Sequence, residues 1–122
     1  MSNSSPQGNL LSSKDIEGHA VYAEDNHEKI GNIHRLMIDR GSGNVAYADI
    51  SFGGVFGIGK EHHMIPWRAL SYHAELDGFV TAITDSQVKA APLPGVADIF
   101  DPSWEQRLHE HYRIRGYWSG LG

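Results

Sequence analysis

The chain has 122 residues, no cysteine and a net charge of −5 with its histidines neutral. This length suits one domain with its own core, the missing cysteine excludes disulfides and thiolate chemistry, and the acidic balance argues against a nucleic-acid partner. The opening segment MSNSSPQGNLLSS lacks the apolar region of a signal peptide, and no run approaches the ~20 apolar residues that span a bilayer. We therefore expect a cytoplasmic protein with a disordered lead over residues 1–13.

Short β-prone runs separated by turn formers follow the lead. They cover residues 19–23, 30–39, 45–52 and 60–67, and the segment LSYHAELDGFVTAIT, residues 70–84, reads as a strand, a turn and a strand. Short strands at close spacing are typical of a small antiparallel β-barrel. The predicted fold is therefore mostly β, with a barrel domain over residues 14–91.

The second of these runs has an imperfect alternation of apolar side chains. Ile33 is out of step with Leu36 and Ile38. An extra residue in the strand would restore the alternation, so the sequence predicts a β-bulge near His34–Arg35. In the next run, VAYADISF, the alternation is regular and places Asp49 on the outer face.

Two helices are predicted after the strands. Thr84 and Gln87 have the spacing of a capping box, which begins a short helix directly after the last barrel strand. Asp101 and Pro102 have the residue types of an N-cap and a first helical position, which begins a second helix. Residues 92–122 are therefore a linker and a C-terminal amphipathic helical extension.

The C-terminal helix carries an apolar stripe. Trp104, Leu108 and Tyr112 recur every four residues, and Tyr117 and Trp118 follow them. A disordered tail would not hold so many aromatic residues. The helix must bury this stripe on its own barrel or on another copy of the chain, and the sequence leaves both open.

The stretch GGVFGIGKE, residues 53–61, has most of the spacing of a phosphate-binding loop. However, Glu61 follows Lys60 where that loop needs a hydroxyl, and its carboxylate would repel phosphates. The next residues have no helical pattern. We therefore interpret the glycines as a compact connection between two strands, in which Phe56 and Ile58 fold inward or lie exposed and self-associate.

The segment IGNIHRLMIDRGSGNVAYADISFGGVFGIGKEHHMIPWRAL, residues 30–70, resembles the PRC-barrel domain. The matching features are, in chain order, Ile30–Gly31, Ile38–Asp39, Gly41, Gly43, Gly53–Gly54 and Ile65–Pro66–Trp67. The resemblance extends over residues 14–91, about two thirds of the chain. This domain is named for the cytoplasmic part of the photosynthetic reaction-centre H subunit, and it also occurs in ribosome maturation factors and stand-alone bacterial proteins.

The resemblance implies a strongly bent barrel of roughly six strands and no general active site. Members of the family mostly act as adaptor or assembly modules, and several are dimers. The C-terminal segment WEQRLHEHYRIRGYW is similar to the tail of stand-alone bacterial members.

Eight histidines are a high number for this length. His62 and His63 are adjacent, so on a strand they face opposite sides and cannot bind one metal ion from the same face. A composite metal site would need histidines from neighbouring strands, and the candidates are His34, His63 and His73. The alternative is that these are solvent-facing side chains, which is the interpretation we prefer.

We expect a non-enzymatic binding or assembly module that pairs with itself as a homodimer and docks an unknown protein partner. No acid–base pair or nucleophile motif is recognisable, so no catalytic residue and no cofactor is assigned. The interface candidates are apolar or aromatic: Phe56, Ile58, Trp104, Leu108, Tyr112, Tyr117 and Trp118. The alternatives are a barrel that senses a small molecule or a metal, and an accessory of ribosome or RNA assembly, which the acidic charge disfavours.

Overall fold

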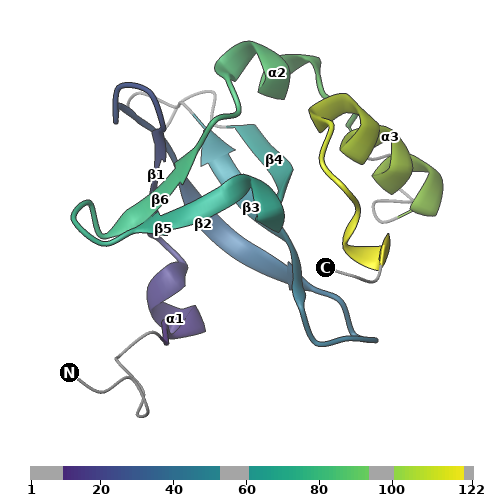
Figure 1. Ribbon diagram of the computed structural model, residues 1–122, viewed down its shortest axis with the longest axis horizontal. Helices are drawn as coiled ribbons and strands as arrows, with labels where there is room; N and C mark the ends of the chain where they lie inside the picture. The colour runs from purple at the N-terminus through teal and green to yellow at the C-terminus, as the bar shows by residue number, and fades with distance from the viewer. Residues whose placement is uncertain (1–9, 53–60, 94–100, 120–122) are drawn as a thin grey trace.

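The computed structural model describes residues 10–52, 61–93 and 101–119 (Figure 1). Its elements are α1 (Ser13–Ile16), β1 (Ala20–Ala23), β2 (Lys29–Ile38), β3 (Val45–Phe52), β4 (Glu61–Pro66), a 3₁₀ turn (Trp67–Ala69), β5 (Leu70–His73), β6 (Gly78–Thr81), α2 (Asp85–Ala90), α3 (Pro102–Tyr112) and a second 3₁₀ turn (Tyr117–Ser119). Most of the predicted lead and linker, and the glycine stretch with Phe56 and Ile58, lie outside the described residues.

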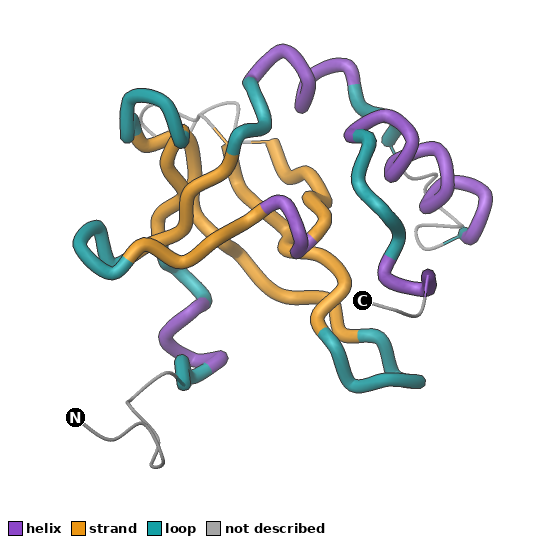
Figure 2. Tube along the Cα trace, in the orientation of Figure 1, coloured by secondary structure: helices purple, strands orange, loops and turns teal. Residues whose placement is uncertain are grey.

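The six strands form one curled sheet in the order β4-β3-β2-β1-β6-β5 (Figure 2). The prediction of a mostly-β, barrel-like fold is confirmed. One pair differs from the expected antiparallel pattern, because β1 and β6 run parallel. The reason is the turn Trp67–Ala69, which bends the chain from β4 into β5 without reversing its direction, so that β6 returns alongside β1 in the same sense.

The predicted bulge in β2 is confirmed. Ile33 pairs with Ile50 and Arg35 pairs with Asp49, so His34 is the extra residue. A second irregularity, between Met37 and Ile38, was not predicted.

The two faces of β3 contact different parts of the chain. On the inner face, Ile50 packs in a core with Ile33 from β2 and Val21 from β1, and each of the three is almost fully buried. On the outer face lie Tyr47 and Asp49, as the alternation predicted. Both are buried as well, because other parts of the chain cover them.

Helix α3 covers the outer face near Tyr47. Its N-cap is Asp101, whose carboxylate accepts hydrogen bonds from the backbone amides of Ser103 and Trp104. The indole of Trp104 lies 6.0 Å from the Tyr47 ring, measured between centroids, and donates a hydrogen bond to the Pro92 carbonyl at 3.0 Å. The helix therefore buries its apolar stripe on its own sheet.

The chain after α3 turns back onto the sheet. Arg113 adopts a left-handed conformation with φ of 57° and ends the helix. The guanidinium of Arg68 then donates hydrogen bonds to the carbonyls of Arg115 and Gly116, both at 3.1 Å. These bonds fix the C-terminal segment beside the corner between β4 and β5. In the part of the chain that the structure describes, no helix is both long and apolar enough to cross a bilayer.

Candidate functional site

Three polar clusters join elements that are distant in the sequence. Two of them lie on the outer face of the sheet, and the third ties α1 to the strands. Polar side chains that converge from different elements are common in functional sites.

The first group, which we call the His–Asp cluster, consists of His34 from β2, Asp49 from β3 and His62 from β4. One possible ligand atom from each residue lies within 4.8 Å of the other two. Nδ1 of His62 is 3.2 Å from Oδ1 of Asp49, and the rings of His34 and His62 lie 4.8 Å apart between centroids. Three adjacent strands therefore bring two imidazoles and a carboxylate together.

Strand pairing explains why these residues meet. Asp49 lies opposite Met64, and His62 is two residues from Met64 on β4, so His62 and Asp49 share the outer face as diagonal neighbours. The bulge in β2 supplies the third member, because the extra residue His34 turns to the side on which Arg35 meets Asp49.

The electrostatics of the His–Asp cluster centre on Asp49, whose residue surface is only 4% exposed. A buried carboxylate needs hydrogen-bonding or charged partners. Arg35 donates from Nε to Oδ2 at 2.9 Å, while Oδ1 faces His62. The side chains of Arg35 and His62 are about half exposed, so the carboxylate is fixed and its partners are accessible.

A hollow of about 120 Å³ lies beside Asp49. Its lining includes Arg35 and His62 from the sheet, Leu93 after α2 and Trp104 from α3. Two members of the His–Asp cluster, Asp49 and His62, therefore border a space that residues 91–93 and α3 also line.

The second group, which we call the covered cluster, consists of Tyr47, Glu105 and His109 beneath α3. The Tyr47 hydroxyl donates to Oε1 of Glu105 at 2.7 Å and lies 3.0 Å from Nε2 of His109. Nδ1 of His109 lies 3.0 Å from the Ile114 carbonyl, to which it donates. These bonds connect β3, α3 and the segment after α3.

Burial determines how the covered cluster ionises. It raises the pKa of Tyr47 far above the usual range, and the hydrogen bond to Glu105 adds to this effect. Burial also lowers the pKa of His109. Near neutral pH Tyr47 is therefore a fixed hydrogen-bond donor, and the chemistry of the cluster suits holding the helix on the sheet.

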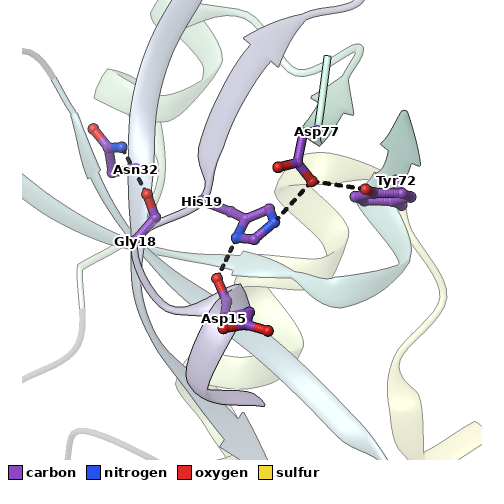
Figure 3. A network of polar contacts seen from close by, with 6 residues as sticks. All are labelled: Asp15, Gly18, His19, Asn32, Tyr72 and Asp77. Atoms are coloured by element: carbon purple, nitrogen blue, oxygen red, sulfur yellow. Dashed lines mark hydrogen bonds and ion pairs between the residues drawn. The ribbon is translucent and has the colours of Figure 1, made fainter. Parts of the chain in front are cut away.

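The third group lies around His19, at the start of β1 (Figure 3). Its Nδ1 donates to the Asp15 carbonyl in α1, and its Nε2 lies 3.4 Å from the carboxylate of Asp77. Asp77 also accepts a hydrogen bond from the Tyr72 hydroxyl at 2.8 Å, and this bond lowers the pKa of Asp77. The His19 contacts tie α1 and β1 to the turn between β5 and β6.

The structure does not bring the predicted metal candidates together. His34, His63 and His73 lie on β2, β4 and β5, none of which are neighbours in the sheet. The ring of His63 packs against Phe52 at 5.7 Å, and that of His73 packs against His27 at 5.2 Å.

His34 instead lies close to His62 and Asp49, and the sequence analysis did not place these two residues beside it. The outward position of Asp49 was visible in the sequence, but placing His62 next to it also required the register between β3 and β4.

The predicted interface residues differ in how far they are buried. Trp104, Leu108 and Tyr112 are buried within the chain. Tyr117 is partly buried and packs against the core, whereas Trp118 is 51% exposed. The other two candidates lie outside the described residues.

Comparison with known proteins identifies one family. The model of the PRC-barrel domain matches residues 8–88, which is most of the chain. No curated protein matches the sequence.

Proposed function

Because the chain belongs to the PRC-barrel domain family, we propose that it is a non-enzymatic assembly module which pairs with a second copy of itself and, in that form, docks a protein partner. The pairing uses the Trp118 surface, which we define as Trp118 with Pro102, Glu105 and Gln106. The observation that carries the proposal is the half-exposed indole of Trp118, in the C-terminal segment that Arg68 holds beside the sheet.

The Trp118 indole is held in place although half of it is exposed. Its ring packs against His109 and Tyr117, with centroids 4.8 Å and 5.1 Å away. It also lies directly over Gly116, where any side chain would collide with it. A large aromatic side chain that is already ordered loses little conformational entropy on binding, and tryptophan is enriched among the residues that dominate interface energies.

The surface around this indole is concave. Pro102, Glu105, Gln106 and Trp118 line a hollow of about 200 Å³. The wall is rigid because α3 is attached to β3 by the covered cluster. A partner surface that fills this hollow would enclose the indole and complete its burial.

The polar residues under α3 support a structural role rather than catalysis. Tyr47, Glu105 and His109 are each more than nine-tenths buried and are hydrogen-bonded to one another or to the backbone. Their bonds join α3 to the sheet and so keep the Trp118 surface in position.

Sedimentation velocity over a range of concentrations tests this proposal. We expect the wild-type chain to dimerise, and Trp118→Ala to weaken the dimer by about tenfold or more, as truncation of an interface hot spot does. Leu10→Ala is the matched control, because Leu10 is an exposed apolar side chain before α1. It should leave the dimer unchanged.

Two results would contradict the proposal. If the wild-type chain stays monomeric at every concentration, the proposed self-association is wrong. Dimers of equal strength in wild type and Trp118→Ala would show that the Trp118 surface is not the dimer interface.

The cytoplasmic location expected from the composition stays a prediction.

A further inference from the structure

We propose that the His–Asp cluster is a binding site for a divalent transition-metal ion, zinc foremost, with His34, Asp49 and His62 as its three protein ligands. The inference goes beyond the proposed function, because it concerns a different part of the surface and needs no second copy of the chain.

The donor set selects the class of ion. Imidazole nitrogen and carboxylate oxygen together suit zinc, cobalt, nickel and copper, whereas calcium and magnesium prefer sites made of oxygen alone. Two histidines and one aspartate from neighbouring strands are three such ligands. The chemistry of the cluster therefore favours a transition metal over an alkaline-earth ion.

Binding of a zinc ion would require only a small movement of the three side chains. In a tetrahedral zinc site with bonds of about 2.0–2.1 Å, the ligand atoms lie about 3.3 Å apart. The corresponding atoms of the cluster lie within 4.8 Å, and those of Asp49 and His62 are already at 3.2 Å. His34 is exposed, so its ring is free to rotate toward the other two.

The backbone and the neighbours of Asp49 prepare the site. The carboxylate is buried, and Arg35 holds its Oδ2 while Oδ1 faces His62. Such an orienting contact to a ligand is typical of metal sites. The bulge at His34 turns a third ligand to the same face, which a regular strand would not do. The positive charge of Arg35 weakens the attraction for a cation and favours moderate rather than very tight binding.

Three protein ligands leave one coordination position open. Asp49 and His62 line a hollow that Leu93 and Trp104 also line. The fourth ligand is therefore expected from this hollow, as a water molecule or a small donor from solution.

Cobalt titration of the tag-free chain tests the site, because cobalt bound by nitrogen and oxygen in a tetrahedral site gives a visible absorption band. We expect one equivalent to bind, zinc to displace it, and zinc to raise the melting temperature. His34→Gln and His62→Gln should each weaken binding by at least about tenfold. Both replace exposed side chains, so the fold should be retained.

His27→Asn is the matched control. His27 is an exposed histidine outside the cluster with φ of 57°, a conformation that asparagine tolerates. It should bind cobalt as the wild type does, and so should Trp118→Ala, which separates this test from that of the proposed function.

Absence of binding in the wild type overturns the proposal. So does binding that survives both glutamine substitutions, or loss of binding in the control as well.

Discussion

Tyr47 and Asp49 stand two residues apart on the same face of β3, yet their surroundings differ. Tyr47 lies under α3, where its hydroxyl meets Glu105 and His109. The carboxylate of Asp49 instead meets the half-exposed side chains of Arg35 and His62. The covered cluster therefore holds β3, α3 and the segment after α3 together, whereas around Asp49 the side chains of Arg35 and His62 stay accessible.

The difference shows that one strand carries both a buried and a partly accessible polar cluster on the same face. A buried polar group that loses its partner retains the full cost of its desolvation, so the covered cluster is sensitive to every change. An accessible side chain exchanges its partner for water at little cost. Substitutions in the covered cluster should therefore lower the stability more than substitutions in the His–Asp cluster, although the two clusters contain similar side chains.

The largest effect is expected where α3 is anchored to the sheet. Trp104→Ala removes an almost fully buried indole, its packing against Tyr47 and its hydrogen bond to Pro92. We expect the free energy of unfolding to fall by about 3–5 kcal/mol, as for other buried aromatic truncations. Urea denaturation followed by circular dichroism measures this loss.

Trp118→Ala is the matched comparison for that experiment, since the same residue type is removed from a half-exposed position. Measured at low concentration, where pairing is weak, it should cost less than about 1 kcal/mol. Similar losses for both tryptophans would mean that α3 is not anchored as the structure indicates.

A smaller effect is expected from the covered cluster itself. Tyr47→Phe keeps the ring but removes the hydroxyl that donates to Glu105, so a buried carboxylate loses one partner. The expected cost is about 1–3 kcal/mol, measured as a lower urea midpoint with an unchanged slope. Tyr72→Phe is the control, because the Tyr72 hydroxyl bonds to Asp77 at an exposed position. An unchanged midpoint for Tyr47→Phe would contradict the role assigned to the cluster.

The features that the sequence predicted well depend on neighbours in the chain. The capping box at Thr84 and Gln87, the N-cap at Asp101 and the bulge at His34 all follow from local geometry and alternation, and all three are confirmed. Asp39 likewise accepts hydrogen bonds from Ser42 in the turn after it, a local contact that aspartate commonly makes. Local rules are reliable here because the atoms involved are only a few residues apart.

The features that were not predicted depend on register and docking. The contact of His62 with Asp49 requires knowing how β4 aligns with β3, and this register is set between strands rather than by residues adjacent in the sequence. The parallel contact of β1 with β6 and the docking of α3 on Tyr47 likewise arise from packing between distant segments. For the same reason sequence reasoning grouped His34 with His63 and His73, whereas in the structure His34 lies beside His62 and Asp49.

The smallest effect, and the one that sharpens the comparison of the clusters most, is a dependence on pH. Burial lowers the pKa of His109 in the folded chain, so between that pKa and the ordinary value of about 6.5 the unfolded chain binds more protons. The free energy of unfolding should therefore decrease as the pH falls below about 6.5. Urea denaturation at several pH values, compared between wild type and His109→Gln, measures the effect. The variant is less stable at neutral pH, but its stability should decrease less on acidification, and parallel pH profiles would show that His109 is not held in its neutral form.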